Sequence, residues 1–280
     1  MKLVKIERDG ATAEGVLEGE TVRIIGAWSQ TPAEVTPFTL SYMGVDELKR
    51  LLAQSKESVA LSSVTLAVPV NPLSQIICAG FNYHNHVTET HTETPANPVI
   101  FKRTIDTLVA HGQPIIKPKV SETLDYEGEI AVIIGREGRH ISEADAMAYV
   151  SGYSCFMDGS VREYQKHAVT SGKNFWRTGA MGPWVVTADE IGSTDLSLET
   201  FVDSEQRQAT VASNMIFSIA KLIAYSSIMT VLKPGDVIAT GTPGGVGSRK
   251  VPPVWLKPGQ LVEVVVEKIG TLSNRVQEEV

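Results

Sequence analysis

The segment that most constrains the fold of this 280-residue chain is residues 125–135, DYEGEIAVIIG. Its second half is an unbroken apolar run with several β-branched residues, which predicts a buried β-strand. Side chains alternate along a strand, so Glu127 and Glu129 point to the same face. Two like charges beside buried material repel each other, and a hard divalent cation with oxygen ligands removes this conflict. An edge strand whose two glutamates face water is the alternative.

Asp158 is the third acid of interest. It follows the apolar residues 153–157, at the end of an expected strand, where loops begin and functional sites gather. With Glu127 and Glu129 it would complete an oxygen-only ligand set, which favours Mg²⁺ or Mn²⁺ over Zn²⁺. An aspartate at such a junction can instead cap the N-terminus of a helix, so this alternative stays open.

A polar segment contains a pair of residues suited to proton transfer. His86 and Glu89 are three residues apart, which makes them neighbours on a helical turn. Glu89 can then orient the imidazole and raise its basicity, as a general base requires. A solvated histidine-rich loop is the alternative, and His84 and His91 compete for the role of base. Because residues 84–110 are largely polar and interrupted by prolines, we expect this segment to be mobile without ligand.

Composition excludes several classes of protein. The chain has 25 Lys and Arg against 32 Asp and Glu, a net charge of −7, which argues against general nucleic-acid binding. It contains no run of about 18 apolar residues, so no transmembrane helix is expected. The start, MKLVKIERDG, has no apolar core of a secretory signal. Cys78 and Cys155 lie far apart in apolar stretches, which indicates two reduced, buried thiols in a cytoplasmic protein without a membrane partner.

The chain is expected to divide into a small N-terminal domain, residues 1–70, and a larger domain, residues 71–280, joined by a linker with Pro69 and Pro72. The expected fold class is mainly β with some α (α+β), with mixed strand connections. Strands are predicted at 2–6, 22–25, 76–79, 125–135, 150–157, 184–187, 237–240 and 261–268, and helices at 40–53, 142–148 and 214–231.

A glycine-rich run, GTPGGVG at 241–247, invites comparison with phosphate-binding loops. It lacks the Gly-Lys-Ser/Thr ending that such loops need, so this interpretation fails. Its backbone amides and Thr242 can still hold a carboxylate.

Several motifs then follow one another in a specific order. They are Gly80-Phe81-Asn82-Tyr83 with His86 and Glu89, then DYEGE, MDGSVREYQ, SGKNF, MGPW and PGDVIATGTPGGVG. This ordered set, over residues 70–270, resembles the fumarylacetoacetate hydrolase family, and within it the shorter acylpyruvase-like and 2-hydroxyhepta-2,4-diene-1,7-dioate isomerase-like members. The resemblance implies a β-roll of packed mixed sheets after a small β-rich N-terminal domain, and a homodimer.

The resemblance also implies roles for individual residues. Mg²⁺ or Mn²⁺ would be bound by Glu127, Glu129 and Asp158. The implied catalytic residues are His86, Glu89 and Lys173, with the first two on a lid, and the implied substrate contacts are Tyr83, Arg103, Arg162, Gln165 and Thr242. Ala79 stands where the name-giving member has a further aspartate ligand, so three acids and water are expected to complete the metal shell. Arg103 stands where many members have lysine, so the far end of the substrate is expected to differ.

The first functional hypothesis is a metal-dependent hydrolase of 2,4-dioxo acids, of the acylpyruvate or fumarylpyruvate type, in aromatic catabolism. His86, held by Glu89, would take a proton from water, and Lys173 with the metal would stabilise the departing pyruvate enolate. Oxaloacetate decarboxylation and keto–enol isomerisation of a 2-hydroxy-dienoate are alternatives on the same metal site. A vestigial small-molecule binding module is the non-enzyme alternative, and the presence of every acid and base argues against it.

Overall fold

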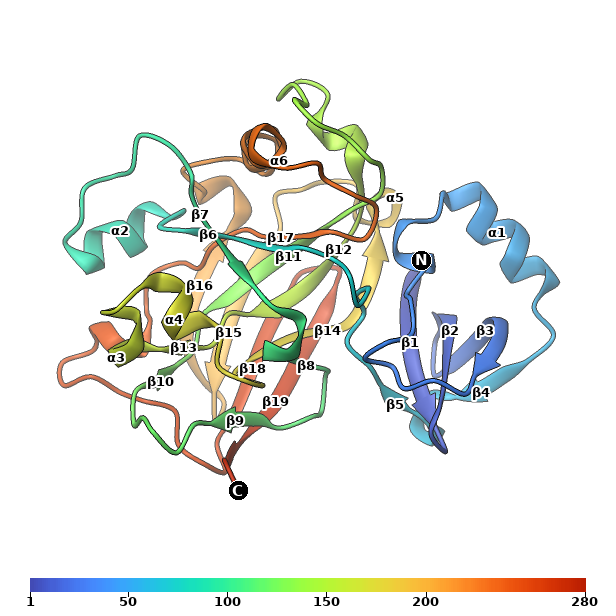
Figure 1. Ribbon diagram of the computed structural model, residues 1–280, viewed down its shortest axis with the longest axis horizontal. Coiled ribbons are helices and arrows are strands. Elements are labelled where there is room, and N and C mark those ends of the chain that lie inside the picture. The colour runs from blue at the N-terminus through green and yellow to red at the C-terminus, as the bar shows by residue number, and fades with distance from the viewer.

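The chain begins with a small β-rich lobe, at the right of Figure 1, in the computed structural model of residues 1–280. A three-stranded meander consists of β1 (Lys2–Arg8), β2 (Ala11–Glu18) and β3 (Thr21–Ser29). It turns at Asp9-Gly10 and again at Gly19, where positive φ angles favour glycine. The lobe is completed by β4 (Ser58–Ala60), β5 (Thr65–Leu66) and α1 (Val45–Gln54).

The largest sheet runs from this lobe into the rest of the molecule. β1 pairs antiparallel with β14 (Gly179–Thr187), with Lys2 opposite Val186 and Leu3 opposite Val185. The strand order is β4-β3-β2-β1-β14-β12-β11-β17-β6-β7, while β5 pairs with β1 and β8 with β14. The strands not yet given bounds are β12 (Val150–Met157), β11 (Gly128–Ile134), β17 (Val237–Ala239), β6 (Ile76–Gly80), β7 (Val99–Arg103) and β8 (Leu108–Val109). This continuous sheet joins residues on both sides of the expected domain boundary at residue 70. The division into two domains stays a prediction.

A second sheet packs against this one to form the main core. Its order is β16 (Glu205–Val211), β15 (Ser197–Val202), β18 (Leu261–Val266), β19 (Gly270–Glu278) and β9 (Ile115–Lys117). A short pair, β10 (Leu124–Asp125) and β13 (Ser160–Val161), lies apart from both sheets. The core cluster joins Val132 of β11 to Val264 of β18 and Leu272 of β19. Parallel pairs, such as β17 with β6, occur among antiparallel ones, so the expected α+β fold of packed mixed sheets is confirmed.

The helices are short and mostly peripheral. They are α2 (His84–Thr90), α3 (Arg162–Gln165), α4 (Val169–Lys173), α5 (Ala188–Ile191) and α6 (Ile219–Met229). The helix predicted over 142–148 is wrong, since only a 3₁₀ turn forms at Ala146–Tyr149. The helix predicted over 214–231 starts later than expected because the Ser218 side chain caps it by accepting from Lys221 N. No helix is long and apolar enough to span a membrane.

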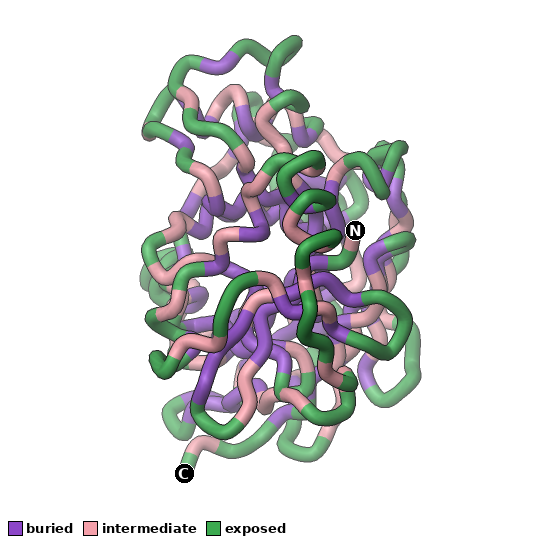
Figure 2. The backbone as a smooth tube through the Cα atoms, turned by 90° about the vertical axis from the view of Figure 1, so that its right-hand side faces the viewer, coloured by how far each residue is buried: buried purple, intermediate pink, exposed green.

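The segment 84–110 does not behave as one polar loop. Residues 88–97 are mostly exposed, whereas His86, Val87, Phe101, Arg103 and residues 107–110 are buried and β7 pairs with β6. Figure 2 shows such buried stretches, in purple, running through the interior beneath exposed loops. The expectation of few buried contacts is therefore wrong for residues 99–110, and mobility stays a prediction only for α2 and the loop after it.

Candidate metal centre and active site

Three buried acids converge where β11 begins and β12 ends. One carboxylate oxygen from each of Glu127, Glu129 and Asp158 lies within 4.8 Å of the others. The backbone N–H of Asp158 donates to the carbonyl of Glu127 at 2.8 Å, which fixes the two strand ends together. β11 has a neighbour on each side, so the alternative of a water-facing edge strand is wrong. Asp158 caps no helix, since Val161 precedes α3.

Positive side chains neutralise two of the three acids. Lys173 Nζ lies 2.5 Å from both Glu127 Oε2 and Asp158 Oδ2. Arg162 lies 2.6 Å from Glu127 Oε1. Burial opposes ionisation of Glu127, but Lys173 and Arg162 outweigh it and lower its pKa to about 2. Burial also disfavours the charged form of Lys173, yet Asp158 and Glu127 raise its pKa above the ordinary value, so this side chain is an ammonium.

Glu129 is the acid that lacks a positive partner. Its Oε2 accepts a hydrogen bond from the Gly241 amide at 2.9 Å, and no ion pair reaches it. Burial and the nearby Asp158 carboxylate hold its pKa well above the ordinary range. A buried carboxylate is stabilised by a bound cation, and an all-oxygen donor set suits a hard divalent one. The three acids therefore fit a divalent metal ion.

The predicted histidine–glutamate pair forms on α2. His86 Nδ1 lies 2.8 Å from Glu89 Oε1, while Glu89 Oε2 accepts from the Gly245 amide at 2.8 Å. Phe81 stacks on the His86 ring with centroids 5.8 Å apart. His86 is buried, so the alternative of a solvated loop does not hold for it, whereas His84 and His91 are exposed. α2 thus rests on the glycine-rich run with His86 directed to the site.

A cavity of about 430 Å³ collects most of the predicted site residues. Those that line it are His86, Glu127, Glu129, Asp158, Arg162, Gln165, Lys173 and Thr242. Glu89 does not line the cavity, but it contacts His86, which does. In Figure 1 the surrounding helices, α2, α3 and α4, lie at the left of the molecule, away from the small lobe.

Two predicted substrate contacts lie elsewhere. Arg103 is buried behind Asp158, and its guanidinium donates to Asp158 Oδ1, the Gly159 carbonyl and Thr178. It therefore positions a metal ligand and has no free face toward the cavity. Tyr83 precedes α2 with its side chain fully buried outside the cavity lining, and burial raises its pKa. Neither side chain lines the cavity, because each turns into the core, and a substrate contact by either residue stays a prediction.

Thr242 lines the cavity with its hydroxyl already engaged. The hydroxyl donates to the Gly128 carbonyl at 2.9 Å and accepts from Gln208 Nε2 at 2.8 Å. Gln208 Oε1 in turn accepts from the Gly128 amide at 2.9 Å. This network anchors the first residue of β11, between the two glutamates. Any carboxylate bound at this position must use backbone N–H groups rather than a free hydroxyl proton.

Sequence reasoning missed a buried acid that organises the site. Asp125 is fully buried, and it accepts from Arg162 Nε at 2.8 Å and from the amides of Gly247 and Ser248 at 2.8 and 2.9 Å. Its position two residues before Glu127, on an alternating segment, was the available signal. Three further lining residues were also missed, Lys166, Arg249 and Trp255.

Comparison with known proteins identifies the family. The family model described as "Fumarylacetoacetate (FAA) hydrolase C-terminal" matches residues 75–277. The chain belongs to the fumarylacetoacetate hydrolase family. Oxaloacetate tautomerase YisK from Bacillus subtilis (strain 168) is 37% identical over 288 residues, which cover 98% of this chain and 89% of that protein.

Structures of other family proteins share the whole fold. The 2-hydroxyhepta-2,4-diene-1,7-dioate isomerase from Mycobacterium marinum superposes with a TM-score of 0.78 at 31% identity, covering 100% of this chain and 99% of that one. Maleylpyruvate hydrolase from Sphingobium sp. SYK-6, in complex with manganese(II) ion and pyruvate, has a TM-score of 0.83 at 25% identity and covers 100% of both chains. The family therefore includes isomerases and tautomerases as well as hydrolases.

Proposed function

We propose that this protein interconverts the keto and enol forms of a 2-oxo acid, with oxaloacetate as the first candidate substrate. The observation that carries the proposal is that a buried three-acid cluster and the His86–Glu89 pair belong to one cavity. The similarity to an oxaloacetate tautomerase over nearly the whole chain supports it. Mg²⁺ or Mn²⁺ is the proposed metal, held by Glu127, Glu129 and Asp158.

The residues of the cavity divide the chemistry among them. A bound divalent cation would polarise the 2-oxo group and acidify the neighbouring carbon. Glu89 holds Nδ1 of His86, which leaves Nε2 to remove a proton from that carbon and return it. The Lys173 ammonium stabilises negative charge that develops on the substrate oxygen. Gln165 and the backbone around Thr242 orient the carboxylate.

Hydrolysis of a C–C bond in an acylpyruvate, the first hypothesis from the sequence, is the second candidate. The same His86–Glu89 pair can remove a proton from water instead of carbon. The shared fold with a maleylpyruvate hydrolase supports this candidate at the level of the family. Oxaloacetate decarboxylation stays a third possibility on the same cluster. A cytoplasmic homodimer, free of nucleic-acid and membrane partners, stays a prediction.

Variants of the α2 pair separate these reactions. His86→Ala is expected to lower kcat for oxaloacetate tautomerisation by about 10²–10⁴-fold, because it removes the general base. Glu89→Gln should lower it less, since the ring stays in place. The measurement is the absorbance of the enol during turnover with Mg²⁺ or Mn²⁺, beside assays of decarboxylation and acylpyruvate cleavage.

The matched control is His84→Ala, an exposed histidine on the same helix that does not line the cavity. It should leave all three rates unchanged. An acylpyruvate rate that exceeds tautomerisation and collapses in His86→Ala would favour the hydrolase. If His86→Ala kept tautomerisation within about threefold of wild type, far short of a general-base effect, the assigned base would be wrong.

A further inference from the structure

A second cavity lies where the small lobe meets the rest of the molecule. It has a volume of about 220 Å³ and shares no lining residue with the cavity at the metal centre. Lys5 of β1 and Val70 of the linker line it from the small-lobe side. The main lobe contributes Leu108, Trp176 and Arg177. In Figure 1, β8, which begins at Leu108, lies on the side of the main lobe that faces β1.

Lys5 gives this second cavity a buried positive charge. The residue is only 2% exposed, and its Nζ donates to the carbonyls of Ala33 and Thr36 at 2.5 and 2.6 Å. No carboxylate forms an ion pair with it, and burial lowers its pKa to about 8, so the ammonium is still the main form at pH 7. A buried cation that is held only by neutral carbonyls leaves a positive potential inside the cavity.

Further hydrogen-bond donors on the lining have no acceptor in the protein. The Arg177 guanidinium lies over the Trp176 ring, 4.9 Å from its centroid, and forms no ion pair or side-chain hydrogen bond. Gln113 accepts a hydrogen bond through Oε1 but donates none through Nε2. The acids on the lining form no ion pair with these donors, namely Glu7, Glu34 and Asp106, and the last two are exposed. Free donors beside a buried ammonium favour an anionic ligand.

This cavity is linked to the metal centre through Arg103. Its Nε donates to Thr107 Oγ1 and its Nη2 to Thr178 Oγ1, both at 3.1 Å, and its Nη1 donates to Asp158 Oδ1 at 2.5 Å. Each of the two threonines is next in sequence to a residue that lines the second cavity. A ligand that holds these neighbours in place would therefore also restrict the motion of Arg103 and of Asp158, a proposed metal ligand.

We propose that the second cavity is an effector site, which binds a small aromatic monocarboxylate through Arg177 and thereby raises the metal affinity of the three-acid cluster. Trp176 is 53% exposed although it lines the cavity, so an aromatic ring packed against it would cover apolar surface. The volume of about 220 Å³ is smaller than that of most drug-sized sites, which limits the ligand to about one ring. Only the effect on the metal rests on the proposed function.

Calorimetry with benzoate and benzamide tests the binding site, because the two share a ring and only benzoate is charged. The full-length protein is titrated with each in the presence of Mg²⁺ and oxalate, which would fill the metal centre. Wild type should bind benzoate about tenfold more tightly, and Arg177→Gln should remove most of this preference. Trp176→Ala should weaken both ligands and keep the preference. The matched control is Arg136→Gln, since Arg136 also lies over an aromatic ring but does not line the cavity.

Titrations with Mn²⁺, with and without saturating benzoate, test the effector role. Benzoate should raise Mn²⁺ affinity about fivefold in wild type and in Arg136→Gln, but not in Arg177→Gln. The binding site is overturned if wild type does not prefer benzoate, if Arg177→Gln keeps the preference, or if Arg136→Gln loses it. A preference for benzoate without a rise in Mn²⁺ affinity overturns the effector role. A protein that binds no Mn²⁺ at all would instead refute the proposed function, while the benzoate preference would still decide the binding site.

Discussion

Asp125 shows how a single buried residue holds several parts of the site in place. Its carboxylate is shielded from water and links β10 to α3 and to the turn at residues 247–249. Removing one partner of a buried ion pair leaves the other charge uncompensated and costs about 3–5 kcal/mol. We expect Asp125→Asn to lower the free energy of unfolding by about 3 kcal/mol, measured by urea denaturation. Asp46→Asn, at an exposed position of α1, should change it by less than about 0.5 kcal/mol. A similar loss in both variants would contradict this role.

Individual site residues could be predicted only as far as local geometry determines them. Strand alternation was enough to bring Glu127 and Glu129 to one face, and helical spacing was enough to pair His86 with Glu89. The placement of Arg103 depends on Asp158, which is 55 residues away in sequence, so no local pattern shows that it turns behind the cluster. Asp125 had one local signal, its position two residues before Glu127, but its partners come from distant segments, so its role in holding them together could not be predicted.

At the scale of the strands, the path of β11 past β15 depends on Gly128. A Cβ atom there would lie 2.0 Å from Thr200 Oγ1 of β15, so only glycine lets the two strands pass this closely. Gly128→Ala should push β11 away, lower Mn²⁺ affinity by at least about tenfold in a calorimetric titration, and destabilise the fold by about 1–3 kcal/mol.

A second substitution tests whether this contact is the cause. Thr200 Oγ1 forms no hydrogen bond, so Thr200→Ala removes the clashing atom without breaking one. The Gly128→Ala/Thr200→Ala variant should therefore recover most of the Mn²⁺ affinity. Gly80→Ala, in strand β6 next to the edge strand β7, brings Cβ no closer than 3.7 Å to another residue and should bind Mn²⁺ normally. No recovery in the double variant would show that the steric explanation is wrong.

Among the elements, strands with continuous apolar runs were the easiest to predict. β6, β11 and β12 follow their predicted ranges closely because burial on both faces leaves a plain signal. β15 was missed although its residues alternate between partly exposed and buried, a period-two pattern that Ser197–Val202 carries in the sequence. The strand has only six residues, three of them polar, so its alternation was too short to stand out in the sequence. Sheet order, including the parallel β17–β6 pair, could not be predicted, since pairing of distant strands leaves no local trace.

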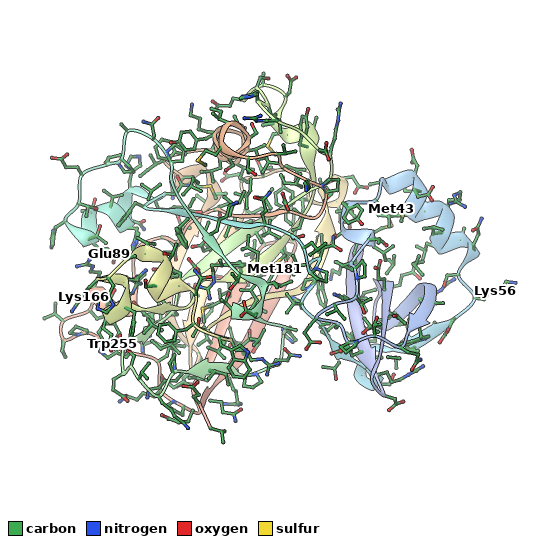
Figure 3. All side chains as sticks on the ribbon, in the orientation of Figure 1. Met43, Lys56, Glu89, Lys166, Met181 and Trp255 are labelled. Carbon is green, nitrogen blue, oxygen red and sulfur yellow. The ribbon has the colours of Figure 1, made fainter.

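At the scale of the whole molecule, the two lobes share more than a linker. The two lobes look separate in Figure 1, but β1 of the small lobe pairs with β14 and so continues the main sheet. One hydrophobic cluster of 17 buried residues also spans both lobes. Its members from the first 70 residues are Leu3, Val16, Phe38, Leu40, Leu48 and Val70. They pack in the same cluster as Phe156 of β12 and Met181 of β14, the latter labelled near the centre of Figure 3.

This shared cluster predicts that the two lobes fold as one unit. Burying one large apolar side chain contributes about 1.5–3 kcal/mol, so six of them supply about 10 kcal/mol, which is comparable to the whole stability of a typical domain. The fragment of residues 71–280 would expose Phe156 and Met181 and leave the β14 edge unpaired. We expect it to aggregate or to melt well below the full chain, while the full chain unfolds in a single calorimetric transition. If the fragment melted at the temperature of the full chain, or if the full chain showed two separate transitions, the lobes would be independent domains and the cluster between them would contribute little.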